Sequence, residues 1–329
     1  MTLLIGMDEA GYGPNLGPLV VSATAWEVPG DPRSANLWEN FAGIVEQTAP
    51  FNDSHIQIAD SKQVYTPARG FGNLEAGVLN AVKVCRAAAV GNDQSDSSCE
   101  RIGDVRGFRE LLGRIAIRPP DDFDAEPWYA GVDLPLAVSQ STLAETWLGR
   151  CRAHGIRLMA IRSDVVLTKR FNDHTRLLDS KGQVLTEISM NLVRHLWQET
   201  GADDCEAVLI IADKHGGRNR YHEFLPIVFG DRFIRCHNES TAQSRYSVGN
   251  AEIRFETKSE RHLPVALASM VSKYLRELAM ILFNRFWTDR QPGLKSTAGY
   301  PVDALRFKAD IAAVQSQLGI GDEILWRER

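Results

Sequence analysis

Apolar residues gather in short runs along the chain, and each run predicts a strand or a helix. Strands are expected at residues 2–7, 18–26, 156–167 and 206–213, where apolar and β-branched residues run together. Residues 55–60 predict a further short strand. Residues 251–258 (AEIRFETK) alternate with the period of two that is typical of a half-buried strand.

Helical periodicity marks five further segments. They are residues 73–89 with Asn73 as a cap, 141–155, 183–201, the long and largely apolar 262–287, and 303–319. Residues 91–104 predict a surface loop, and residues 117–128, which are rich in proline and acids, predict an irregular segment. Strands mixed with helices favour an α/β fold with a central sheet flanked by helices.

Composition narrows the class of protein. The 329 residues are 44% hydrophobic and 24% charged, which is typical of a globular protein with a large core. The net charge of -5 argues against non-specific coating of nucleic acid but leaves room for a local basic groove. Five scattered cysteines without a CxxC pair suit a reducing compartment. The N-terminus lacks signal-peptide features and no apolar run is long enough to span a membrane, so we expect a soluble cytoplasmic protein.

Carboxylates stand at the ends of separate predicted elements. Asp8 and Glu9 follow the first strand, Asp213 ends the strand at 206–213, and Glu260 precedes the long helix. Each acid taken singly is explained as a solvated loop residue or a cap. If the strands are neighbours, the four carboxylates repel one another, and divalent cations relieve the conflict. Oxygen ligands without His or Cys favour Mg²⁺ or Mn²⁺, and two such ions can hydrolyse a phosphodiester.

The segment GMDEAGYGPNLGPLVV, residues 6–21, resembles the opening of type 2 ribonucleases H, roughly GxDEAGRGxxxGPxVV. Four further blocks follow in the order of that family. They are DSK at 60–62, LIIAD at 209–213, FETKSERHLPVALASMVSKY at 255–274, and AGYPVD at 298–303. The segment RNRYHEFL after Asp213 and the block at 255–274, with KxE rather than KxD, resemble the HIII form of the family more than the HII form.

The resemblance implies a ribonuclease H-like mixed sheet flanked by helices, within a single domain over residues 1–329. It also implies a C-terminal helical portion at about 288–329, while residues 66–160 have no counterpart and are expected to form a large insertion. The implied activity is metal-dependent cleavage of the RNA strand of an RNA–DNA hybrid, or of a DNA duplex containing ribonucleotides. This reaction leaves 5′-phosphate and 3′-hydroxyl ends and uses two Mg²⁺ or Mn²⁺ ions.

The resemblance also assigns roles to residues. Asp8, Glu9, Asp213 and Glu260 are expected to be catalytic and to hold the two ions. Substrate-binding residues are expected to be Gly11, Tyr12, Gly13, Lys62 and Tyr300. Tyr12 stands where the family has Arg or Lys, and Gln63 stands where the family has a second Lys.

Other functions stay open at this point. A hybrid-binding protein without catalysis is one alternative, because Tyr12 removes a cation and the spacing from Glu260 to the long helix is about one residue short. An actin-like ATPase or kinase is another, because IADKHGG resembles a phosphate loop of that class. The basic segment KHGGRNRYH after Asp213 suits a phosphate-rich substrate, although a solvated loop explains it as well.

Overall fold

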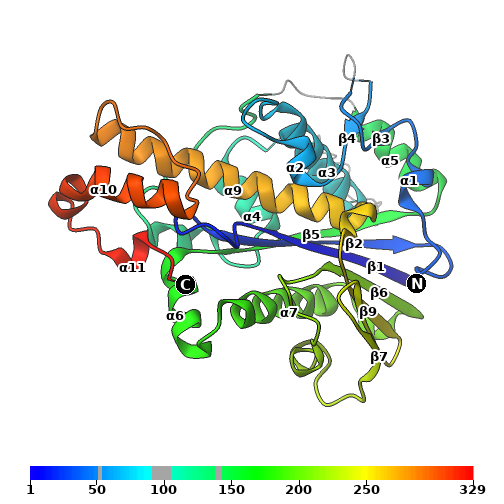
Figure 1. Cartoon of the computed structure of the whole chain (residues 1–329). Helices are drawn as coiled ribbons and strands as arrows, with labels where there is room; N and C mark the ends of the chain where they lie inside the picture. The colour runs from blue at the N-terminus through cyan, green and yellow to red at the C-terminus, as the bar shows by residue number, and fades with distance from the viewer. Residues whose placement is uncertain (51–53, 91–104, 138–142, 329) are drawn as a thin grey trace.

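A mixed β-sheet forms the centre of the computed structural model, which describes residues 1–50, 54–90, 105–137 and 143–328 (Figure 1). In the described part of the chain the sheet has seven strands. Their order is β5 (Arg157–Val166), β2 (Leu19–Val28), β1 (Thr2–Ala10), β6 (Ala207–Asp213), β9 (Ala251–Glu256), β8 (Gln243–Val248) and β7 (Arg235–Glu239). β6 is parallel to both β1 and β9, and the other pairs are antiparallel. The carboxyl ends of β1, β6 and β9 therefore meet at one edge of the sheet.

Helices cover both faces of this sheet. Figure 1 shows α9 (Leu263–Arg290) across one face and α7 (Lys181–Glu199) on the other. The period of two in β1 explains the layers, since Leu4 joins the core cluster under α9 and Leu3, Ile5 and Met7 join the cluster under α7. The predicted class, an α/β fold with a mixed sheet flanked by helices, is confirmed.

α9 lies unusually close to β1. A Cβ atom on Gly6 would stand 2.3 Å from the carbonyl carbon of Pro264 and 2.4 Å from the nitrogen of Val265. Only glycine permits this approach of helix to strand. Pro264 is tolerated because it occupies the first turn of the helix, where its missing N–H has no intrahelical partner. The first glycine of GMDEAG thus sets the distance between the long helix and the acids that follow.

The segment predicted as an insertion, residues 66–160, packs on the α9 face. It contains α3 (Gly72–Val90), α4 (Phe108–Ile115), the 3-10 helix η1 (Pro120–Ala125), α5 (Leu143–Ala153) and the first residues of β5. Side chains of this segment such as Val78 and Trp147 belong to the same apolar cluster as α9. That the segment is an insertion into a single domain over 1–329 stays a prediction.

The C-terminal portion is helical, as predicted, with α10 (Pro301–Gln317) and α11 (Asp322–Leu325). After α11 the chain returns to the sheet, where the backbone N–H of Arg327 donates to the carbonyl of Asn15 at 2.8 Å. The C-terminal end therefore lies against the glycine-rich turn after β1.

Several sequence predictions were wrong in detail. The strand expected at 55–60 shrinks to β4 (Ile56–Gln57), paired with β3 (Val45–Glu46), because Asp60 already caps α2 (Ser61–Val64). Asn73 lies inside α3 rather than capping it, and its side chain donates to Gln57. The irregular segment 117–128 contains η1. The loop expected at 91–104 lies outside the described residues, as do the first residues of the helix expected at 141–155.

Other elements carried no strong pattern and were missed. β7 is exposed throughout, and in β8 a buried serine interrupts the apolar alternation. The remaining elements are α1 (Leu37–Asn40), α6 (Thr168–Leu178), η2 (Ala202–Asp204), η3 (His222–Phe224), α8 (Pro226–Phe229) and η4 (Ser259–Arg261). No helix in the described residues has the length and apolar character needed to cross a membrane.

Candidate functional site

The sheet brings two of the predicted acids side by side. β1 and β6 run parallel, and their register pairs Met7 with Ala212, so the next residues are Asp8 and Asp213. Asp8 is buried, and its backbone carbonyl accepts a hydrogen bond from Ser272 of α9 at 3.1 Å. Glu9 follows on β1, and strand alternation directs it to the opposite face from Asp8.

Glu260 comes to the same edge through the turn η4. Ser259, its neighbour, donates to Oδ1 of Asp213 at 2.8 Å, which ties the turn to the end of β6. Lys258 adopts a left-handed backbone conformation with φ of 58°, and this redirects the chain from β9 into η4. The short spacing before α9 therefore does not remove Glu260 from the acidic group.

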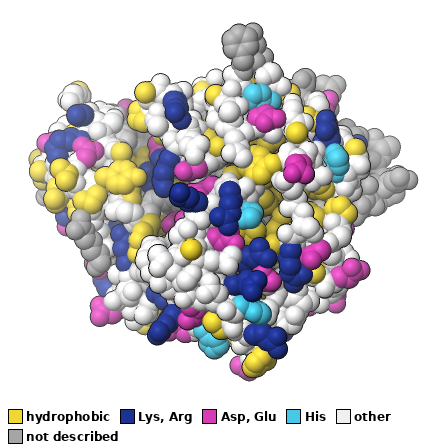
Figure 2. All heavy atoms as spheres, turned by 45° about the vertical axis from the view of Figure 1, so that its right-hand side comes forward, with side chains coloured by type: hydrophobic (Ala, Val, Ile, Leu, Met, Phe, Trp, Pro, Cys, Tyr) yellow, Lys and Arg dark blue, Asp and Glu magenta, His cyan; other side chains and the backbone are white. Residues whose placement is uncertain are grey.

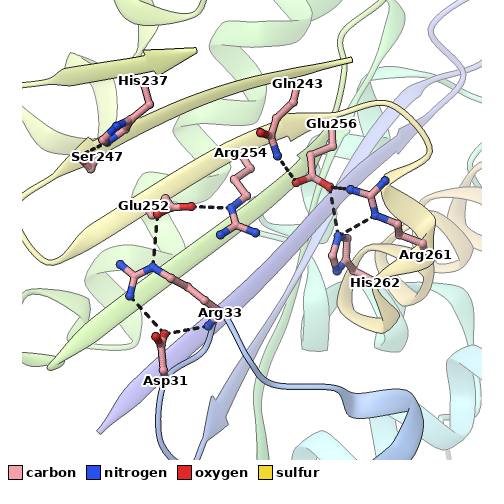
Figure 3. A network of polar contacts seen from close by, with 10 residues as sticks. All are labelled: Asp31, Arg33, His237, Gln243, Ser247, Glu252, Arg254, Glu256, Arg261 and His262. Atoms are coloured by element: carbon pink, nitrogen blue, oxygen red, sulfur yellow. Dashed lines mark hydrogen bonds and ion pairs between the residues drawn. The ribbon is translucent and has the colours of Figure 1, made fainter. Parts of the chain in front are cut away.

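A polar network on β9 holds the other side of this turn (Figure 3). Glu256, paired with Asp213 in the sheet register, accepts hydrogen bonds from His262 at 3.1 Å, from Gln243 at 2.7 Å and from Arg261. Burial alone would raise the pKa of Glu256, but the bonds from His262 and Gln243 and the Arg261 charge lower it to about 2. Glu256 therefore favours its ionised form, and its hydrogen bonds anchor Arg261 and His262, which directly follow Glu260.

The four acids influence one another's ionisation. Burial and then the charges of Glu9 and Asp213 raise the pKa of Asp8 well above its usual value. Burial, followed by the charge of Asp213, raises the pKa of Glu9 to about 7. Burial likewise raises the pKa of Asp213 and of Glu260, and the Asp213 charge adds to the latter. Such a group gains from a nearby cation.

Lys62 supplies one cation to this group. Its charge lowers the pKa of Glu9, Asp213 and Glu260, so it lies close to these acids. Its role in substrate binding stays a prediction. Asp60, which caps α2 by accepting from the N–H of Lys62 at 3.0 Å, raises the pKa of Glu260. Asp60 was not predicted as a site residue, although its place in the DSK block was a signal for it.

The four acids do not form a ready metal-coordination site in this structure. Among the residues that the structure describes, no three His, Cys, Asp or Glu side chains lie close enough to hold an ion. Alternation along β1 is one reason, since Asp8 and Glu9 leave the strand in opposite directions. The donor set still fits a hard divalent cation, because it consists of carboxylate oxygens whose ionisation is impeded until a cation arrives.

The glycine-rich turn after β1 lies over two buried arginines. Gly11 has a φ of +85°, and a Cβ there would stand 2.7 Å from Cδ of Arg276. Nη2 of Arg327 donates to the carbonyls of Gly11 at 2.6 Å, Tyr12 at 3.1 Å and Pro14 at 2.7 Å. Arg327 of the C-terminal segment therefore holds the turn through these hydrogen bonds. No motif around Arg327 indicated this role.

Tyr300 stands beside this turn. A Cβ on Gly13 would lie 3.9 Å from Cε1 of Tyr300, whose side chain is 53% exposed. The Arg276 guanidinium is 5.9 Å from the centre of the Tyr300 ring. The structure thus brings the predicted substrate-binding residues Gly11, Tyr12, Gly13 and Tyr300 into one place. Lys62 lies apart from this turn in sequence but next to the acids, as described above.

Surface charge is mixed on the face of the molecule drawn in Figure 2. Figure 2 shows Lys and Arg side chains next to Asp and Glu across the middle of the face in view, with histidines among them. This agrees with the net charge of -5 and differs from the uniform basic surface of a non-specific nucleic-acid coat.

Among known proteins, this chain has matches in solved structures but not in family models or curated proteins. The ribonuclease HII in a complex with PCNA from Archaeoglobus fulgidus is 14% identical with a TM-score of 0.40, covering 99% of this chain and 94% of that one. The ribonuclease H2 from Pyrococcus horikoshii OT3 is 14% identical with a TM-score of 0.43, covering 98% and 92%.

A third structure, Bst-RNase HIII in complex with Mn²⁺, is 14% identical with a TM-score of 0.43, and the match covers 99% of this chain and 66% of that one. These three solved structures are a ribonuclease HII, a ribonuclease H2 and a ribonuclease HIII.

Proposed function

We propose that this protein is a divalent-metal-dependent endonuclease that cleaves the RNA strand of RNA–DNA hybrids. One observation carries the proposal. The parallel register of β1 and β6 brings Asp8 and Asp213 together at a sheet edge, where Glu9 and Glu260 join them and the pKa values of all four are raised. Such a charge conflict is costly for folding and is useful to a protein that binds cations there.

Asp8, Glu9, Asp213 and Glu260 would hold two Mg²⁺ or Mn²⁺ ions. When bound, such ions activate a water and stabilise the leaving oxygen of a phosphodiester, which gives 5′-phosphate and 3′-hydroxyl ends. Asp8 would be the central ligand, because it is buried and the charges of Glu9 and Asp213 add to burial in raising its pKa. All four acids must lose their protons before they can serve as ligands.

The turn Gly11–Tyr12–Gly13 and Tyr300 would place the substrate. The turn lies directly after the acids and beside the exposed Tyr300 ring, so a sugar–phosphate backbone can pass over the turn while a sugar packs on the ring. Peptide groups of the turn can contact 2′-hydroxyls, which distinguish RNA from DNA. Lys62 would meet a phosphate next to the acids, where its charge also offsets theirs.

Cleavage of an end-labelled RNA–DNA hybrid tests the proposal. The parent protein should cut the hybrid with Mg²⁺ or Mn²⁺ and leave DNA and RNA duplexes intact, and Asp213→Asn should abolish the cutting. The open spacing of the acids favours one other function, a hybrid-binding protein without catalysis. Retained binding without any cutting by the parent would select that alternative, and neither binding nor cutting would refute both.

A further inference from the structure

A cavity lies beside the acidic group, on the side of the sheet covered by α7. It has a volume of about 510 Å³ and is lined by Tyr12, by Gly182 in the first turn of α7, and by the loop 215–220 after β6. This volume is within the range of roughly 300–1,000 Å³ that small-molecule sites have. This loop belongs to the basic segment KHGGRNRYH, which the sequence explains either as suited to a phosphate-rich substrate or as a solvated loop.

Hydrogen bonds from the buried Lys214 hold this loop in one conformation. Lys214 is buried, and its ammonium group donates to the carbonyl of Arg218 at 3.3 Å, to Oδ1 of Asn219 at 2.8 Å and to the carbonyl of Ser240 at 2.5 Å. Gly216 has a φ of +59°, which lets the chain turn back at this point. Lys214 therefore fixes the loop, and Arg218 is the residue that the loop presents to the cavity.

Arg218 and Tyr12 face the same part of the cavity. A Cβ atom on Gly182 would stand 3.7 Å from the hydroxyl of Tyr12 and 3.9 Å from Nη2 of Arg218. Nη1 of Arg218 pairs with Glu223 at 3.2 Å, and the guanidinium lies 4.6 Å from the centre of the Phe224 ring, so its orientation is fixed. A guanidinium and a hydroxyl that converge in this way are suited to a phosphate oxygen.

The inner wall of the cavity offers a second polar group. His215 is only 6% exposed, and its Nδ1 lies 3.1 Å from Oγ1 of Thr186, while its ring packs edge-on against Tyr221 and Phe255. Among the described residues a side-chain hydrogen bond of His215 is found for Nδ1, and none is found for Nε2. A hydroxyl group can donate to this nitrogen or accept from it, so a hydroxyl fits in either protonation state.

We propose that this cavity is a subsite for one ribonucleotide of the bound strand. Its phosphate lies against Arg218 and the Tyr12 hydroxyl, and its 2′-hydroxyl bonds to Nε2 of His215. Within a nucleic-acid strand the 2′-hydroxyl is the free hydroxyl of the sugar, so the pairing of phosphate and hydroxyl selects RNA over DNA. This inference rests on the proposed function and adds Arg218 and His215, which lie outside the glycine-rich turn, to the residues that contact the RNA strand.

The phosphate half is tested by binding without cleavage. Affinity for a fluorescent RNA–DNA hybrid is measured in EDTA at a series of salt concentrations, for the parent, Arg218→Gln and Arg232→Gln. Arg232 is the matched control, because it also pairs with a surface acid, Asp203, at 2.6 Å and does not line the cavity. Loss of one phosphate contact should weaken binding roughly tenfold and lower the salt slope by about one for Arg218→Gln. The control should match the parent.

The hydroxyl half is tested with substituted RNA. A 2′-fluoro group, which cannot donate a hydrogen bond, is placed at one position of the RNA strand at a time. One position should weaken binding to the parent about fivefold while leaving His215→Phe unaffected, because the phenyl ring has already lost the nitrogen. Equal responses of the two proteins at every position would overturn this half, and the scan of the parent alone remains informative if His215→Phe does not fold.

These measurements distinguish failure of the proposed function from failure of the proposed subsite. A parent protein that neither binds nor cuts the hybrid refutes the proposed function itself. A parent that binds the hybrid, with Arg218→Gln equal to the parent and to Arg232→Gln, refutes the subsite and leaves the proposed function standing.

Discussion

Replacing Arg327 with methionine should remove the hydrogen bonds that hold the glycine-rich turn in place. Arg327 is 1% exposed, and its Nη2 donates to the carbonyls of Gly11, Tyr12 and Pro14 at 2.6–3.1 Å. Methionine fills much of the same volume but donates nothing, so these carbonyls lose their charged partner. Each unsatisfied buried acceptor costs about 1–3 kcal/mol.

The net loss is smaller than the sum of these terms. Burying the guanidinium itself costs several kcal/mol. This cost is also why burial lowers the pKa of Arg327 to about 9. Methionine carries no charge and avoids this cost, which offsets part of the stability lost with the hydrogen bonds. We expect a net destabilisation of about 3 kcal/mol. With an unfolding entropy of about 2.1 cal/mol/K per residue, this lowers the melting temperature of the 329-residue chain by about 4 °C.

Thermal unfolding followed by circular dichroism measures this shift, and hybrid binding in EDTA reports on the turn. Arg176→Met is the matched control, because Arg176 pairs with Glu328, the residue after Arg327, but is exposed, and an exposed ion pair contributes little to stability. Weaker hybrid binding is expected for Arg327→Met alone. A melting temperature equal to that of the control, with unchanged binding, would refute the idea that the C-terminal segment fixes the turn.

Three further predictions follow from the geometry. Gly6→Ala should destabilise the fold by about 1–3 kcal/mol in chemical denaturation, because its Cβ would meet backbone 2.3 Å away, whereas Gly149→Ala, with open space around it, should be neutral or stabilising. Since burial and the neighbouring Asp213 raise the pKa of Glu9 from 4.5 to about 7, the folded state holds that proton more tightly. Stability in EDTA should fall as pH rises across this interval, and Glu9→Gln should flatten the fall. Glu256→Gln should raise the Mg²⁺ concentration needed for half-maximal cleavage several-fold by loosening the turn of Glu260, and an unchanged requirement in a metal titration would contradict that role.

The pattern of apolar residues was sufficient to predict the main strands and long helices. Apolar spacing is long and regular in the segments that form β1, β2, β5, β6, β9 and α9. In these segments the local periodicity agrees with the burial of the side chains. Prediction failed where the partner was remote. β7 is exposed along its length, so pairing with β8 rather than apolar spacing makes it a strand. Ile56–Gln57 stops early because Asp60 caps the next helix.

The sequence also determined which acids and glycines to consider, because their motifs are local. Tertiary structure decided what they can do. The parallel register of β1 and β6 sets Asp8 beside Asp213, and the tie from Ser259 brings Glu260 to both. Arg327 reaches the glycine-rich turn from more than 300 residues away, as the separation of 316 between it and Gly11 shows. A one-dimensional pattern records spacing along the chain, whereas hydrogen bonds and charge coupling depend on distance in space.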